Sequence, residues 1–159
     1  MTFEVRLGEP GDIDGAAAVW ARATATRDGK AEIPPLDAAR AVLLDSLRDE
    51  RSTFVVAVEE SGVVGFATAE PAGSAEVAEV RFVGVDPGRW GSGVGGVVMA
   101  RLVDELAAAG FLSAQLLVYA DNASARRLYE RMGWTRDGQE PTLHPRTGKP
   151  EVRYVIILT

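Results

Sequence analysis

The chain has 159 residues, 47% of them hydrophobic and 25% charged, which is enough for one globular domain with a sizeable core. Its net charge of −6 argues against a general surface for nucleic acid or an anionic membrane, so we expect neither as a partner. It has no cysteine and one histidine, His144, which excludes disulfides, a cysteine nucleophile and a His/Cys zinc cluster, and we expect no metal. The first residues lack the pattern of a signal peptide, and no apolar run reaches the roughly 18 residues of a membrane span, so we expect a cytoplasmic protein.

Hydrophobic periodicity and turn residues predict the elements of the first half of the chain. They are a strand at 3–7, a helix after the N-cap Asp12, a polar loop at 24–37, a second helix capped by Asp37, and strands at 54–58 and 63–67 joined through Ser61-Gly62. Consecutive strands joined by tight turns are typical of an antiparallel meander.

The second half alternates strands and helices. The predicted elements are a strand at 79–85, a helix with Val94, Val98, Leu102 and Leu106 on one face, a strand at 113–119, a short helix capped at Asp121-Asn122 and stopped at Gly133, a polar loop at 136–150, and a last strand at 153–158. The order predicts a single mixed α/β domain over residues 1–159, with an antiparallel meander first and a crossover later.

A glycine-dense turn lies between the strand that ends at Val85 and the helix that follows. Its sequence is Val85-Asp86-Pro87-Gly88-Arg89-Trp90-Gly91-Ser92-Gly93-Val94-Gly95-Gly96. Glycines leave backbone N–H groups unshielded, and the first amides of a helix have no internal partner and lie at the positive end of its dipole. The turn therefore predicts a site for a phosphate or pyrophosphate at residues 91–96.

The same residues satisfy the dinucleotide pattern G-x-G-x-x-G, with Asp121 at a suitable distance for a ribose contact. In a dinucleotide-binding unit, however, this turn follows the first strand. Here it follows several strands, and too little chain remains to complete that fold. The Gly-Lys-Ser/Thr of nucleotide hydrolases is absent.

Two segments carry a resemblance to a known family. They are Val85-Asp86-Pro87 with Trp90-Gly91-Ser92-Gly93-Val94-Gly95, and Asn122-x-x-Ala125-x-x-Leu128-Tyr129-Glu130-x-x-Gly133-Trp134. Together with the element order, they resemble the GNAT superfamily of acyl-CoA-dependent N-acetyltransferases over essentially the whole chain. One departure stands out, because the first position of the family pattern Gln/Arg-x-x-Gly-x-Gly/Ala falls on Trp90, with Arg89 displaced by one.

The resemblance implies a mixed, twisted, mostly antiparallel sheet flanked by helices, with acetyl-CoA as the co-substrate. The pyrophosphate would bind the amides of Gly91, Ser92, Gly93, Val94, Gly95 and Gly96. The pantetheine arm would run along the strand from Val83 to Val85 as an added strand does. Arg89 is a further candidate contact. Asn122 would contact the arm or cap the next helix, whereas for Arg126 and Arg127 a solvated helix face is the preferred interpretation.

The resemblance also implies two catalytic side chains. Tyr129 corresponds to the tyrosine that protonates the departing thiolate, with a core tyrosine as the alternative. Glu79 occupies the strand position of the family's general base, with Glu76 in reserve. An ion pair of Glu79, for instance with Arg81, is the structural alternative. His144 is expected to be exposed or structural. Without cysteine, the consistent mechanism is direct attack in a ternary complex.

The sequence therefore predicts acetyl transfer from acetyl-CoA to a primary amine, either a small molecule or a peptide N-terminus, by a possible homodimer. The acceptor site is expected from residues 20–36, the loop 136–150 and the face near Glu79. A non-catalytic CoA-binding sensor and a dinucleotide-dependent oxidoreductase are the alternatives, which amine turnover and cofactor preference would separate.

Overall fold

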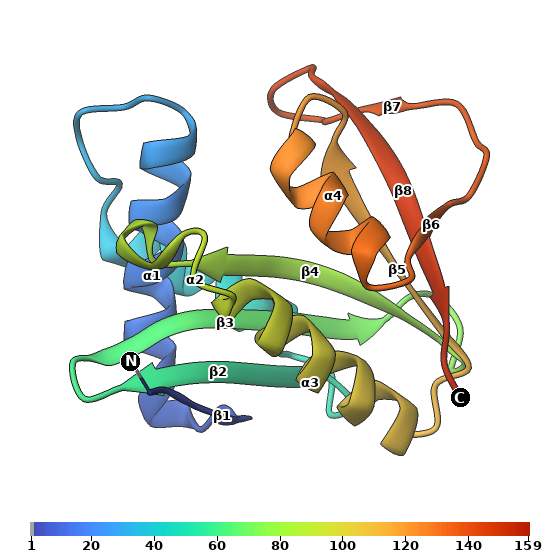
Figure 1. Cartoon of the computed structure of the whole chain (residues 1–159), viewed down its shortest axis with the longest axis horizontal. Coiled ribbons are helices and arrows are strands. Elements are labelled where there is room, and N and C mark those ends of the chain that lie inside the picture. The colour runs from blue at the N-terminus through green and yellow to red at the C-terminus, as the bar shows by residue number, and fades with distance from the viewer. Residues whose placement is uncertain (1) are drawn as a thin grey trace.

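The computed structural model describes residues 2–159, which form one mixed sheet with helices on both faces (Figure 1). The strands are β1 (Glu4–Leu7), β2 (Thr53–Glu59), β3 (Gly62–Pro71), β4 (Val77–Val85), β5 (Ser113–Tyr119), β6 (Thr135–Arg136), β7 (Thr142–Leu143) and β8 (Pro150–Ile157). The helices are α1 (Ile13–Arg27), α2 (Leu36–Ser46), α3 (Val94–Ala108) and α4 (Ala123–Arg131), with short 3-10 turns η1 (Pro10–Asp12) and η2 (Pro87–Arg89). In this described range, no helix is long and apolar enough to cross a bilayer.

The strand order in the sheet is β1-β2-β3-β4-β5-β8-β6, and β7 pairs with β8. All of these pairs are antiparallel except β4 with β5, which run parallel around the crossover helix α3. The predicted mixed and mostly antiparallel sheet is therefore confirmed. The meander occupies the first half of the chain, as expected from its tight turns.

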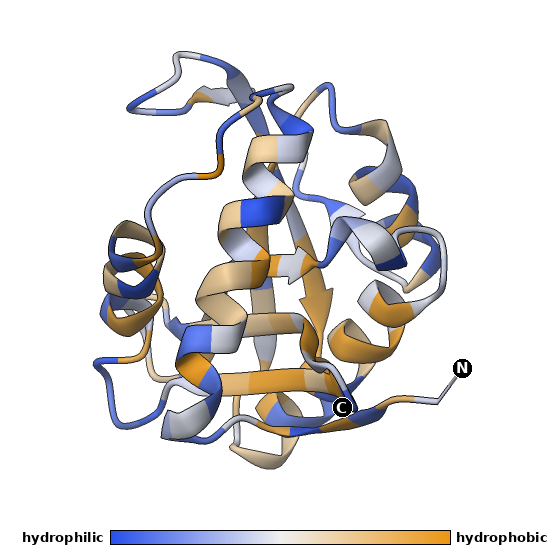
Figure 2. Ribbon diagram, turned by 90° about the vertical axis from the view of Figure 1, so that its left-hand side faces the viewer, coloured by the Kyte–Doolittle hydropathy of each residue, from blue (hydrophilic) through white to orange (hydrophobic). Residues whose placement is uncertain are grey.

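Two apolar cores lie on opposite faces of the sheet. On one face, α1 and α2 pack on the sheet through residues such as Val19 and Leu43, which belong to the same core cluster as Phe66 of β3. On the other, α3 contributes Val98 and Leu102 to a larger core that α4 joins at its own end of the sheet. Figure 2 shows the apolar residues gathered in the central strands, with polar residues in the outer loops.

Some element boundaries differ from the sequence prediction. Helix α1 continues through Arg27, so the loop predicted from residue 24 starts later, because Ala25 is buried and keeps that turn packed. The Thr24 hydroxyl also donates to the Trp20 carbonyl at 2.9 Å within the helix. Helix α2 begins at Leu36 after Pro35, so Asp37 lies in its first turn instead of capping it.

Strands β4 and β5 pair over a short stretch and then separate (Figure 1). Their register runs from Val77 with Ser113 to Val80 with Leu116 and ends there. The next residue of β4, Arg81, is an extra residue opposite β3, where the register shifts. Such a bulge bends its strand and increases the local twist. The second half of β4 therefore has β3 on one side and no strand on the other.

Candidate active site

The open edge of β4 presents backbone groups of Val83 and Val85. The amide of Asp86 donates to the carbonyl of Val64 on β3 at 2.8 Å, so the backbone of Asp86 faces β3. Backbone direction alternates along an antiparallel strand, so Gly84 also faces β3, whereas Val83 and Val85 face the side that β5 has left. This edge can pair with an extended ligand as it would with another strand.

The glycine turn after β4 presents backbone amides at the start of α3. Gly91 and Gly93 have φ angles of 81° and 93°, which glycine adopts without the steric cost of a side chain, and α3 begins at Val94. The Ser92 amide donates to the Arg89 carbonyl at 3.2 Å and is used inside the turn. Within residues 2–159, no acceptor is bonded to the amides of Gly91, Gly93, Val94, Gly95 and Gly96. Five donors are therefore free to bind an anion beside the open edge of β4.

Three side-chain links hold this turn to the rest of the fold. Arg89 binds the carboxylate of Glu59 on β2, and the Asp86 carboxylate accepts from Arg22 of α1 at 3.2 Å. The indole Nε1 of Trp90 donates to the Val85 carbonyl at 2.8 Å. The guanidinium of Arg89 thus has a carboxylate partner inside the protein, and its role as a cofactor contact stays a prediction.

Glu79 lies where β4 and β5 are about to separate, one residue before the last paired position. Its neighbours Ala78 and Val80 belong to the core under α3, so alternation places the Glu79 side chain on the opposite face. The side chain is 19% exposed, and its Oε1 accepts from Gln115 at 2.8 Å and from Arg153 at 3.1 Å. No donor among the described residues is bonded to Oε2. The ion pair is thus made with Arg153, while Arg81 pairs with Glu70.

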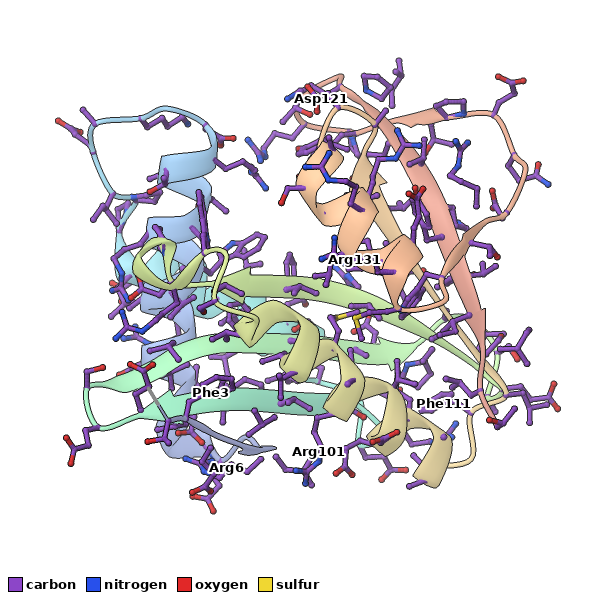
Figure 3. All side chains as sticks on the ribbon, in the orientation of Figure 1. Phe3, Arg6, Arg101, Phe111, Asp121 and Arg131 are labelled. Carbon is purple, nitrogen blue, oxygen red and sulfur yellow. The ribbon has the colours of Figure 1, made fainter. Side chains whose placement is uncertain are left out.

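Tyr129 belongs to the core on the α3 and α4 face. Helix α4 runs between the labelled residues Asp121 and Arg131 in Figure 3, and it turns Tyr129 inward against the rings of Trp134 and Tyr154, each 6.2 Å away between centroids. Burial raises the pKa of Tyr129 from 10.0 to about 12, so its hydroxyl keeps its proton to a higher pH than that of an ordinary tyrosine. Among residues 2–159, no hydrogen-bond partner of that hydroxyl is found, which leaves it available to a ligand.

Other predicted residues have structural contacts. The Asn122 side chain caps α4 by accepting from the Ala125 amide at 3.2 Å. Arg126 donates to the Tyr154 hydroxyl and to the Ala120 carbonyl, so it is packed into the fold and the interpretation of a solvated face is wrong for this residue. His144 is half-buried and has a structural role, because its Nδ1 accepts hydrogen bonds from two backbone amides of its own loop.

The geometry sets two chemical groups on opposite faces of one split in the sheet. The carboxylate of Glu79 lies on the α1 side, and the protonated hydroxyl of Tyr129 lies on the α3 and α4 side. Between them the second half of β4 has an unpaired edge, which leads to the amides of the glycine turn. A ligand with an anionic group at one end and an amide-bearing arm suits this arrangement.

Comparison with known proteins decides the family. The model of the acetyltransferase (GNAT) family matches residues 19–134, a range that includes the glycine turn, Glu79 and Tyr129. The chain belongs to the GNAT acetyltransferase family. The family prediction is confirmed, and so is the expectation of an acetyltransferase that uses acetyl-CoA, the donor of this family.

Curated relatives of this GNAT domain are longer proteins. The mycothiol acetyltransferase of Renibacterium salmoninarum is 35% identical over 102 residues, and that of Kocuria rhizophila is 40% identical over 90 residues. The matches cover 58% and 52% of this chain, but 30% of each relative. The chain therefore corresponds to less than a third of these proteins.

Solved structures share the fold across nearly the whole chain. The ribosomal-protein-S18-alanine N-acetyltransferase from Escherichia coli superposes with a TM-score of 0.77 at 21% identity, covering 99% of this chain and 95% of that one. The protein yncA from Salmonella typhimurium, solved with its cofactor acetyl-CoA, gives 0.79 at 21% identity, covering 100% and 95%. At this identity the likeness establishes the fold of the GNAT domain.

Sequence reasoning missed several residues of the site. Arg153 and Gln115, which hold Glu79, come from strands whose register no local pattern reveals. Glu59, the partner of Arg89, lies at the end of β2 and is 30 residues away in the chain. For Trp90 a signal did exist, because it occupies the position where the family carries Gln or Arg.

Proposed function

We propose that this GNAT domain transfers the acetyl group of acetyl-CoA to a primary amine by direct attack in a ternary complex. The observation that carries the proposal is the row of five free amides at the start of α3, next to the unpaired edge of β4. An anion site and a strand edge in this order suit the pyrophosphate and the pantetheine arm of one ligand.

The donor would bind with its pyrophosphate on the amides of Gly91 and Gly93 to Gly96. The pantetheine amides would pair with Val83 and Val85, whose backbone groups face the open edge, although the Val85 carbonyl also accepts from the Trp90 indole at 2.8 Å. This direction leads the thioester toward the point where β4 and β5 separate, near Glu79 and Tyr129. Asn122 caps the N-terminus of α4, the helix that carries Tyr129, and its contribution to the cofactor is indirect.

Glu79 acts as the base in this proposal. Its Oε1 is held by Gln115 and Arg153, and its Oε2 is free to accept a proton from the acceptor ammonium. The neutral amine then attacks the thioester carbonyl carbon, the new C–N bond forms, and the C–S bond breaks. Fixing one carboxylate oxygen orients the other, which favours proton transfer in a defined geometry.

Tyr129 acts as the acid. Its hydroxyl carries a proton at neutral pH, as any tyrosine does, and it donates that proton toward the departing sulfur. The nitrogen loses its second proton to water as the amide forms, and the sulfur gains the Tyr129 proton, so CoA leaves as the thiol. Exchange with solvent then deprotonates Glu79 and reprotonates Tyr129, and one proton is released overall. Both roles require the thioester to lie in the split between the two faces of the sheet.

For the acceptor, we propose a small-molecule amine or a peptide N-terminus. It would bind on the α1 side of the sheet, next to the Glu79 carboxylate. Mycothiol acetyltransferases are among the relatives and ribosomal-protein acetyltransferases among the fold neighbours, so both acceptor classes belong in a screen. A homodimer and a cytoplasmic location complete the proposal.

Thermal shift with acetyl-CoA, CoA and NADH at equal concentration tests the donor first. A ligand at 100 times its dissociation constant stabilises a fold by roughly 2.7 kcal/mol, which is several degrees at this size. We expect a shift with the CoA pair alone, followed by CoA release with at least one amine of a panel. A shift with NADH alone would favour the alternative of a dinucleotide-dependent oxidoreductase. Binding of acetyl-CoA without turnover of any amine would favour a non-catalytic CoA-binding sensor.

A further inference from the structure

We propose that Arg89 positions the phosphate-binding turn through Glu59, and that it is not itself a ligand of the pyrophosphate. This inference rests on the proposed function, because it assigns a role at the same donor site. It changes the expected role of the residue nearest to the family's Gln/Arg position.

The contact between Arg89 and Glu59 is a bidentate ion pair. Arg89 Nε lies 2.9 Å from Oε2 and 3.0 Å from Oε1 of Glu59, and Nη2 lies 2.5 Å from Oε1. The Glu59 side chain is 8% exposed, so its charge is withdrawn from water and depends on this partner. Hydrogen bonding from Arg89 lowers the pKa of the Glu59 carboxyl. The pair therefore fixes the turn to the end of β2.

The remaining nitrogen of the guanidinium is also engaged. Nη1 of Arg89 donates to the Gly88 carbonyl at 3.4 Å, so each of its three nitrogens has an acceptor within the protein. The charge of Arg89 is offset by Glu59 at close range. The positive potential of the turn consequently comes from the free backbone amides and the start of α3.

The backbone of Arg89 is where the turn is held together. Its amide donates to the Asp86 carbonyl at 2.7 Å, and its carbonyl accepts from the Ser92 amide at 3.2 Å and from the Ser92 hydroxyl at 2.5 Å. A side chain locked to β2 thus fixes the residue to which both halves of the turn are bonded. Amides already aimed at the anion site lose less conformational entropy when the ligand binds, which raises affinity.

Acetyl-CoA titration calorimetry on two variants tests the inference. Glu59→Gln removes the carboxylate but keeps Arg89, and Arg89→Lys keeps a positive charge but loses the two-pronged contact. We expect both to raise the dissociation constant about tenfold, since a loosened turn loses its preorganisation. The matched control is Glu105→Gln, which removes the Arg101–Glu105 ion pair farther along α3 (Arg101 is labelled in Figure 3) and should bind as the parent does.

A direct contact between Arg89 and the pyrophosphate predicts a different effect of these variants on the affinity for acetyl-CoA. If Arg89 contacts the pyrophosphate, Glu59→Gln frees its guanidinium and affinity stays equal or improves, and Arg89→Lys retains most of the binding. Either result overturns the inference.

Amide exchange by NMR gives a readout without ligand: in Glu59→Gln we expect faster exchange at the bonded amides of Trp90 and Ser92, with the middle of α3 unchanged. Unchanged exchange would also contradict the positioning role of the Arg89–Glu59 ion pair. Failure of the parent to bind acetyl-CoA would refute the proposed function instead.

Discussion

The indole of Trp90 is hydrogen-bonded to the last residue of β4, with Nε1 2.8 Å from the Val85 carbonyl. Trp90 is 50% exposed, so this bond holds a large surface side chain in one place. It joins the two parts of the proposed donor site, the open strand edge and the glycine turn. The position that carries Gln or Arg in the family therefore has a neutral donor that links these two parts.

Trp90→Phe keeps an aromatic ring and removes the N–H donor. One hydrogen bond contributes about 1 kcal/mol, so we expect the dissociation constant of acetyl-CoA to rise by roughly fivefold. Titration calorimetry measures the change, and an unaltered unfolding midpoint confirms that the fold is intact. Unchanged or tighter binding would mean that the indole does not hold the site in its binding shape.

Glu79→Gln should reduce the turnover number about 100-fold near neutral pH with an amine from the panel. The loss should shrink at high pH, because more of the acceptor amine is then already neutral. Glu76→Gln is the matched control, since Glu76 is exposed in the loop before β4. A flat pH profile for the ratio of the two rates, or an equal loss in the control, would remove Glu79 as the base.

Tyr129→Phe should lower the turnover number by about two orders of magnitude and leave the dissociation constant of acetyl-CoA within about twofold. The reason is that the hydroxyl would act on the departing sulfur while the ring packs against Trp134 and Tyr154 in both proteins. Single-turnover kinetics separate chemistry from product release. Equal rates in variant and parent would assign Tyr129 to the core alone.

Burial of Tyr129 also predicts a loss of stability at alkaline pH. Its pKa is about 12 in the folded protein, against 10.0 for an ordinary tyrosine, so between these values the unfolded chain loses a proton that the native state keeps. Stability from this group is complete below pH 10 and falls by about 1.4 kcal/mol per pH unit as pH rises toward 12. Urea unfolding at several pH values should show a shallower fall in Tyr129→Phe, and parallel curves would contradict the burial argument.

The local pattern of the chain predicts most of the fold. The alternation around Ser61-Gly62 gives the β2–β3 hairpin, and the glycine turn gives the start of α3, because both depend on neighbouring residues. The two motifs then predict the family. The boundaries of the helices and strands are less well predicted. Helix α1 extends beyond its expected end because the tertiary packing of Ala25 outweighs the polar sequence there.

Contacts across the sheet are beyond such reasoning. Glu79 and Arg81 are two residues apart and would share a face in a regular strand, which favours an ion pair between them. The bulge at Arg81 breaks this alternation, and Arg153, 74 residues away, becomes the partner of Glu79. The pairing of β4 with β5 ends next to the same bulge, so the shape of the candidate site follows from strand register and not from a motif.

An NMR titration of the ¹⁵N-labelled protein with acetyl-CoA tests the donor site most directly. We predict the largest chemical-shift changes at the free amides of Gly91 and Gly93 to Gly96, together with Val83 and Val85 on the open edge of β4. Changes confined to other surfaces, with these amides unmoved at saturation, would contradict it.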